Sequence, residues 1–204
     1  FLRYYLSNPA PFHLLGRLTT AFLSTIFLWI TYQFMKKYFS QKSAFIALIM
    51  LVFLPIVVTH SHYVTTDVPL LLFIILAFLS LMEIGRKGDA KSYILSGFLI
   101  GIASGVKYNG LFLLFPYLFM HLWKFRGEKI HKPLIHPPFY TGIFFFLLGF
   151  IASSPFLMSD WVTFFRDVES QSKHMYQGQF GWEGLSYSFI PHLKHLNQGM
   201  RLAL

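Results

Sequence analysis

Three ionisable side chains stand where long apolar stretches of the sequence begin or end: Arg17, Asp67 and Lys107. A charged group at membrane depth costs roughly 2.5–3.5 kcal/mol on insertion scales, so such residues usually have a functional reason or an ion-pair partner. Asp67 lies in the polar connection of residues 60–69, between two hydrophobic stretches. We expect it either to cap the helix that follows or to serve in catalysis or metal binding, and the two roles are compatible.

Lys107 follows three glycines spaced four residues apart, Gly97, Gly101 and Gly105. Glycines on one helix face let a second helix pack closely, and this stripe would deliver Lys107 to the end of a helix bundle. A lysine in that place either binds a lipid phosphate as a compact cation or extends its ammonium towards water at the interface. Arg17 is expected to begin a helix, where the dipole disfavours a cation. Either an anionic neighbour offsets this, or the arginine is an interfacial anchor.

His60, His62 and Asp67 are candidates for a divalent metal site, because imidazole and carboxylate are ordinary metal ligands. Their spacing matches no stringent metal motif, and histidines at a membrane interface are the alternative. The sequence contains no P-loop, GxSxG, HExxH or dinucleotide fingerprint. It contains no cysteine, which excludes disulfides and thiolate metal sites in this stretch.

The composition is that of a membrane protein. Hydrophobic residues make up 55% and charged residues 12% of the sequence, about half the charged fraction of a soluble domain. The net charge is +9, and ten of the seventeen lysines and arginines fall in residues 36–42, 86–91 and 124–132, between apolar blocks. Basic clusters between apolar blocks are typical of the cytoplasmic connections of a membrane protein, and this placement argues against nucleic acid as a partner.

The apolar blocks predict an all-α transmembrane bundle over residues 1–158, because a spanning helix needs about 20 mostly apolar residues. About six membrane segments are expected, near residues 16–35, 44–59, 68–84, 93–106, 110–123 and 139–158. We interpret residues 93–123 as two short segments, because a single crossing would place one basic cluster outside. On this topology Arg17, Asp67 and Lys107 share the outer face.

Residues 159–204 change character, mixing aromatic with charged side chains. They are expected to form an amphipathic loop at the outer face, with a turn at residues 178–181.

Several short motifs follow one another in a familiar order. Arg17 precedes LPIVVTHSHYVTTDVP at residues 54–69, GFLIGIASGVKYNG at residues 97–110 and SSPFLMSD at residues 153–160. Together they resemble the GT-C superfamily of polyprenyl-phosphate-sugar glycosyltransferases. The nearest members are the protein O-mannosyltransferases and the bacterial aminoarabinose–lipid A transferase group. The resemblance covers residues 14–181.

The resemblance implies an inverting membrane glycosyltransferase with a polyprenyl-phosphate sugar donor of dolichyl or undecaprenyl type. The acceptor would be a lipid, a glycan or a protein. It implies a multi-pass protein of the cell membrane whose active face is periplasmic or extracellular, or lumenal in the endoplasmic reticulum. Asp67 would lie near a metal ion or the acceptor. Lys107 and Arg17 would hold the donor phosphate and stabilise the charge that develops as it leaves the sugar.

One feature of the family has no counterpart in this sequence. The principal catalytic carboxylate lies in a first outer loop after a first transmembrane helix, so we expect it upstream of Phe1 and expect the chain alone to be inactive. The main alternative is a transporter or flippase core, since intramembrane charges and broken helices also suit transporters. A third alternative, a non-catalytic assembly subunit, would tolerate substitution of Asp67 and Lys107.

Overall fold

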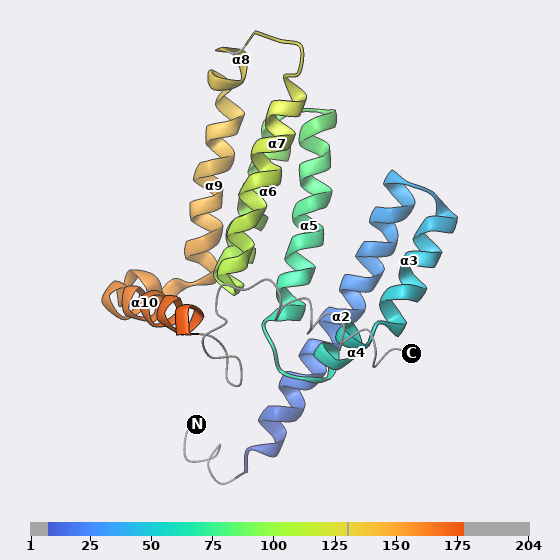
Figure 1. Ribbon diagram of the computed structural model, residues 1–204, viewed down its shortest axis with the longest axis vertical. Coiled ribbons are helices and arrows are strands. Elements are labelled where there is room, and N and C mark those ends of the chain that lie inside the picture. The colour runs from blue at the N-terminus through green and yellow to red at the C-terminus, as the bar shows by residue number, and fades with distance from the viewer. Residues whose placement is uncertain (1–7, 130, 178–204) are drawn as a thin grey trace. The chain divides into compact units, whose positions relative to one another are not determined.

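The computed structural model describes residues 8–129 and 131–177, and every regular element in these ranges is a helix (Figure 1). The all-α membrane-type fold predicted from the sequence is confirmed. The described residues fall into two compact units. The first takes its residues from 1–53 and 57–154, and the second from 54–56 and 155–204.

Local sequence sets several helix boundaries in the first unit. Gly88, with φ of 66°, follows α5 and adopts the left-handed conformation that glycine tolerates best. Asp89 caps the next helix, its carboxylate accepting a hydrogen bond from the Ser92 amide at 3.2 Å. Pro137 and Pro138 begin α9, where missing amide hydrogens cost nothing. The elements of this unit are α2 (Ala10–Tyr38), α3 (Gln41–Phe53), α4 (Pro55–His62), α5 (Asp67–Arg86), α6 (Ala90–Val106), the 3₁₀ helix η1 (Tyr108–Leu113), α7 (Leu114–Lys124), α8 (His131–Leu134) and α9 (Pro137–Ser153). The first two residues of α4 are counted with the second unit.

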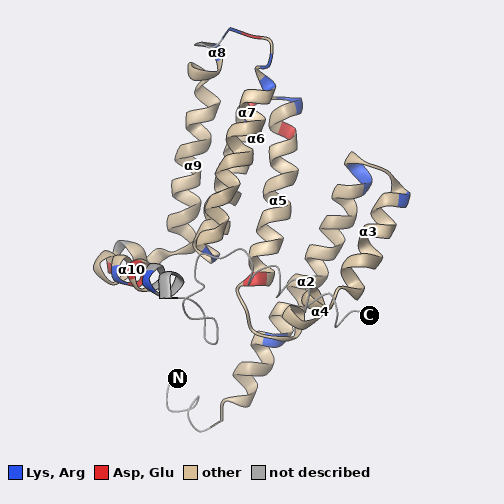
Figure 2. Ribbon diagram, viewed as in Figure 1, with Lys and Arg blue, Asp and Glu red and all other residues tan. Residues whose placement is uncertain are grey.

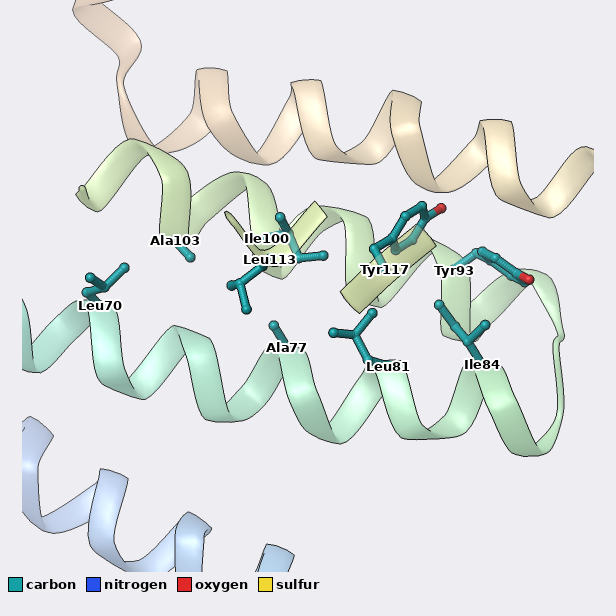
Figure 3. Packing of buried hydrophobic residues seen from close by; sticks show 9 residues of the cluster. All are labelled: Leu70, Ala77, Leu81, Ile84, Tyr93, Ile100, Ala103, Leu113 and Tyr117. Atoms are coloured by element: carbon teal, nitrogen blue, oxygen red, sulfur yellow. The ribbon is translucent and has the colours of Figure 1, made fainter. Parts of the chain in front are cut away.

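Helices α5, α6 and α7 share one apolar core with η1 (Figure 3). The chain reverses direction between α6 and α7. The reversal is evident from the Tyr93 hydroxyl near the start of α6, which lies 2.7 Å from Nδ1 of His121 near the end of α7. The reversal places η1 and α7 back along α6. The buried residues of this core are Leu70, Ala77, Leu81, Ile84, Tyr93, Ile100, Ala103, Leu113 and Tyr117.

Helices α6 and α9 pack closely through glycines. A Cβ added at Gly97 would lie 2.7 Å from the carbonyl carbon of Gly142, and one added at Gly101 would lie 2.7 Å from the amide nitrogen of Phe150. Such approaches are possible only without side chains, so the glycine stripe found in the sequence is a packing surface. It fixes the end of α6, and Lys107 follows directly.

Two of the described helices, α2 and α5, are long and apolar enough to cross a membrane. A third crossing is added if α3 and α4 count as one span broken by a bend of 60°. Helices α6 and α9 are apolar but shorter, at 17 residues each. The count of about six membrane segments therefore stays a prediction.

Residues 44–59 fold as parts of two helices, α3 and α4, because Pro55 disfavours helical backbone at Leu54 and the chain bends there. A bent pair can still be one span, so the membrane segment over these residues stays a prediction. One predicted helix start was wrong. Arg17 does not begin a helix, because α2 starts seven residues earlier, at Ala10. Pro11 in its first turn favours that start, so the helix extends beyond the apolar stretch.

Large apolar side chains stay exposed on several helices. Phe22 on α2, Met50 on α3 and Phe115 on α7 are 65%, 67% and 71% exposed. On α2, the hydroxyl groups of Thr19, Thr25 and Thr31 each donate to the carbonyl four residues earlier. Apolar surface with internally satisfied polar groups suits lipid surroundings.

The second unit contains η2 (Pro155–Met158) and α10 (Trp161–Gln177). The Asp160 carboxylate accepts a hydrogen bond from the Thr163 amide at 3.0 Å and so caps α10. Apolar Trp161, Phe165 and Val168, one turn apart, are exposed. The outer-face placement of residues 159–204 stays a prediction, and the turn predicted at residues 178–181 lies outside the described residues.

Candidate active site

Asp67 and Lys107 form an ion pair. The ammonium Nζ of Lys107 donates to Oδ1 of Asp67 at 2.7 Å, and each side chain is about one third exposed, at 33% and 34% respectively. The two residues come from separate helices and stand 40 positions apart in the chain. Topology alone placed them on one face, and the fold brings them into contact.

Both residues stand at helix ends. Asp67 is the first residue of α5, where the helix dipole favours a carboxylate. Lys107 is the residue between α6 and η1, with extended backbone at φ −156° and ψ 133°. The predicted capping role of Asp67 is wrong: the residue before the helix is Thr66, and no side-chain hydrogen bond caps α5 there. The Asp67 carboxylate is directed to Lys107 instead.

His60 lies on the other side of the same carboxylate. Its Nδ1 is 3.2 Å from Oδ2 of Asp67, within ion-pair range but off the line that a hydrogen bond requires. Nδ1 of His60 and Oγ1 of Thr65 are buried, and neither has a hydrogen-bond partner in the described part of the chain. Buried polar atoms normally have partners, so these two atoms are unsatisfied within the described residues.

The three residues predicted to bind a metal ion are not assembled as ligands. Nδ1 of His62 lies 2.7 Å from the Val58 carbonyl oxygen, one turn back along α4. Within the ranges that the structure describes, no group of three histidine or acidic side chains is placed to hold an ion. The Lys107 ammonium already neutralises Asp67. The arrangement therefore fits an ammonium–carboxylate pair better than a divalent ion, and the metal ion stays a prediction.

Arg17 lies at the same end of the first unit but outside the ion pair. The neighbouring Gly16 abuts Val64, since a Cβ at Gly16 would lie 2.7 Å from Cγ2 of Val64. This contact joins α2 to the connection between α4, which carries His60, and α5, which begins at Asp67. Arg17 itself is exposed and forms no ion pair with any described carboxylate.

The basic clusters lie at the opposite end of the helices (Figure 2).

At that opposite end, His121 links α7 to the chain before α9, with Nε2 3.0 Å from the Pro133 carbonyl oxygen. A carbonyl only accepts, so Nε2 carries the proton and Nδ1 accepts from the Tyr93 hydroxyl. Sequence reasoning missed this link. Tyr93 and His121 each lie fourteen positions from Lys107, so pairing residues about the predicted turn would have found it.

Comparison with known proteins supports the sequence resemblance. A model of the family described as dolichyl-phosphate-mannose-protein mannosyltransferase matches residues 14–158, which is 145 of the 204. The matched stretch includes Asp67 and Lys107. No curated protein matches the chain, and no solved structure does. Since the match covers more than half of the sequence, this chain belongs to the dolichyl-phosphate-mannose-protein mannosyltransferase family, a family of membrane glycosyltransferases of GT-C type.

Proposed function

We propose that this chain takes part in the transfer of a sugar from a polyprenyl-phosphate lipid to a lipid, glycan or protein acceptor at the outer face of the membrane. Membership of the family supports a lipid-linked donor. The observation that carries the site is the ion pair between Lys107 and Asp67, formed where α6 breaks and α5 begins.

Lys107 is the proposed phosphate ligand. In the transfer, the bond between the sugar's anomeric carbon and a phosphate oxygen breaks, and the phosphate keeps the electron pair. A new bond forms from the acceptor oxygen to the anomeric carbon, while the acceptor's hydroxyl proton passes to a base. Negative charge therefore grows on the phosphate, and an ammonium beside it stabilises the transition state. The Lys107 side chain is 33% exposed, so a phosphate can reach its ammonium.

Asp67 is the proposed counter-ion of Lys107 before the donor binds. Once a phosphate takes the ammonium, the carboxylate is free to accept a hydrogen bond from a hydroxyl group. His60, 3.2 Å from Oδ2, stays beside it. Arg17 lies at the same end on α2 and is a second cation available to the phosphate or its bridging oxygen.

The charge distribution supports the outer face. Ten of the seventeen basic residues lie in the connections at the end opposite to Asp67 and Lys107. The positive-inside rule assigns such an end to the cytoplasm, and the candidate site then faces outward. The three candidate charges gather at one end rather than at mid-membrane, which favours a transferase over a transporter.

Transfer of labelled sugar tests the proposal. Membranes containing the protein expressed from its full-length gene would be supplied with polyprenyl-phosphate mannose, the first sugar to try given the family. Lys107→Ala is expected to lower the transfer rate by roughly 10²-fold, the effect of removing one preorganised transition-state donor. Asp67→Asn is expected to lower it as well.

Lys132→Ala is the matched control. Lys132 also pairs with a carboxylate, at 2.6 Å from Oε2 of Glu128, but it lies at the end of the helices opposite to Asp67 and Lys107. It is expected to retain full activity. Unchanged transfer by Lys107→Ala at matched expression would overturn the site assignment. No transfer by the wild type from any polyprenyl-phosphate donor, with the protein correctly inserted, would overturn the proposed function.

A further inference from the structure

The Glu83 carboxylate near the end of α5 is surrounded by cations. Lys37 and Arg86 lie 2.6 and 3.1 Å from its Oε1. Lys87 lies 3.3 Å from Oε2, and the Tyr38 hydroxyl donates to Oε1 at 2.9 Å. Glu83 is largely covered, with 17% of its side chain exposed. One carboxylate thus holds three cations drawn from two helices.

A fourth cation joins from α7. Nζ of Lys124 lies 3.4 Å from the Arg86 carbonyl oxygen, and its aliphatic stem crosses Gly88, where an added Cβ would meet Cε at 2.7 Å. We define the basic cluster as the set Lys37, Arg86, Lys87 and Lys124. Its first three members remain 47%, 58% and 62% exposed, so their charged groups can be reached by a ligand.

The cluster carries positive charge that described side chains do not neutralise. The connections at this end hold ten lysines and arginines, against Glu83 at the end of α5 and two further acids, Asp89 and Glu128. Asp89 is engaged by Ser92 as a helix cap, and Glu128 pairs with Lys132 at 2.6 Å. Three cations around a single carboxylate, with Lys124 beside them, repel one another, and an added anion relieves that repulsion.

The position of the cluster identifies the anion. It lies at the ends of α2 and α5, the two helices long and apolar enough to cross a membrane, and therefore at the level of lipid headgroups. An aromatic and cationic border accompanies it, since the Arg126 guanidinium lies 4.0 Å from the centre of the Trp123 ring. Cytoplasmic leaflets carry anionic lipids that attract such basic sites.

We propose that the basic cluster binds the phosphate of an anionic phospholipid headgroup. Glu83 holds the cations together when the lipid is absent. It limits the affinity of the cluster for the lipid, because the carboxylate and the headgroup phosphate compete for the same cations. This binding site is separate from the proposed transfer site and independent of the proposed reaction.

Thermal unfolding of the full-length protein in detergent tests the site. Phosphatidylglycerol is expected to raise the midpoint of the wild type by several degrees relative to the same amount of phosphatidylcholine. The variant Lys37→Ala/Arg86→Ala/Lys87→Ala is expected to lose most of this shift. Glu83→Gln is expected to show a larger shift than the wild type, although its own midpoint without lipid is lower. Inorganic phosphate at the same concentration is expected to give no shift, because it lacks the acyl chains that hold a headgroup at the membrane surface.

Three exposed lysines elsewhere at this end provide a matched control. Lys42→Ala/Lys91→Ala/Lys129→Ala removes the same charge without touching the cluster, and it is expected to keep the phosphatidylglycerol shift. Equal loss in both triple variants would overturn the proposal in favour of unspecific attraction. An equal shift with inorganic phosphate would also overturn it, as would equal midpoints in the two lipids. If the cluster variant does not fold, Arg86→Gln replaces it with the same expected direction.

Discussion

Gly101→Ala is predicted to separate α6 from α9. The Cβ that alanine adds would lie 2.7 Å from the Phe150 amide nitrogen and 3.0 Å from Cα of Gly149, and closer still to the Phe146 carbonyl oxygen. Ordinary Cβ contacts begin at 3.4 Å. All three neighbouring atoms belong to the α9 backbone, so no side chain can turn away. The helices must move apart by at least the difference between 3.4 and 2.7 Å.

The size of the effect follows from two opposing terms. Overpacking a tight interface costs typically about 1–3 kcal/mol, and a backbone collision lies at the upper end of that range. Replacing glycine by alanine within a helix stabilises the helix by about 1 kcal/mol. A net loss of about 2 kcal/mol is expected, which for a chain of this size corresponds to a melting midpoint lower by about 4–8 °C. Because the end of α6 carries Lys107, sugar transfer is expected to fall as well.

Gly85→Ala is the matched control on α5. Its added Cβ would collide with the far end of a flexible side chain, Cε of Met120 at 2.5 Å, and that methyl group can rotate away; Cδ1 of Trp123, at 3.9 Å, is in ordinary contact. Thermal unfolding of both variants in the same detergent, followed by circular dichroism, is the assay. Gly85→Ala is expected to match the wild type or exceed it slightly. If Gly101→Ala unfolds at the wild-type midpoint, the close packing of α6 on α9 is refuted.

Three further predictions concern single side chains. The hydrogen bond from the Ser92 hydroxyl holds the pKa of Asp89 below its ordinary value, so this cap stabilises the fold at neutral pH and loses its effect as the pH falls below about 4. Asp89→Ala should therefore lower the midpoint at pH 7 and reduce its further fall between pH 5 and pH 3. Tyr117→Phe removes the donor to the Phe139 carbonyl at 2.8 Å in a buried place, and a loss of about 1–2 kcal/mol is expected in denaturant unfolding. Lys107→Arg keeps the charge but not the compact ammonium, and the transfer assay should show activity between those of the wild type and Lys107→Ala.

The contact between Asp67 and Lys107 could be anticipated from the sequence in part. Basic clusters fixed which helix ends lie together, and that put both residues on one face. The glycine stripe before Lys107 indicated close packing correctly, because glycines four apart have few other uses in an apolar helix. What topology could not supply was the contact itself, which depends on the direction of two side chains at helix ends.

Other features depended on local geometry that hydropathy does not encode. The bend at Leu54 follows from Pro55, whose effect on the preceding residue is masked when a window of apolar residues is averaged. The start of α2 lies outside the apolar stretch, so Arg17 fell inside a helix rather than at its beginning. The role of Glu83 was not predicted, because a single acidic residue near basic residues in a sequence usually indicates an ordinary surface ion pair. Only the fold shows that helix ends far apart in the chain gather around it.

Binding of polyprenyl phosphate, without its sugar, to the purified full-length protein tests the central claim most directly. The affinities of wild type, Lys107→Ala, Asp67→Asn and the double variant would be compared by native mass spectrometry. Lys107→Ala is expected to weaken binding by about 10–100-fold, the worth of a hydrogen bond to a charged group. Asp67→Asn is expected to tighten it by up to about fivefold, because a partly exposed ion pair competes by at most about 1 kcal/mol. The double variant should bind like Lys107→Ala. Wild-type affinity in Lys107→Ala would contradict the assignment of the donor phosphate to this lysine, and unchanged or weaker binding by Asp67→Asn would contradict the exchange of Lys107 between carboxylate and phosphate.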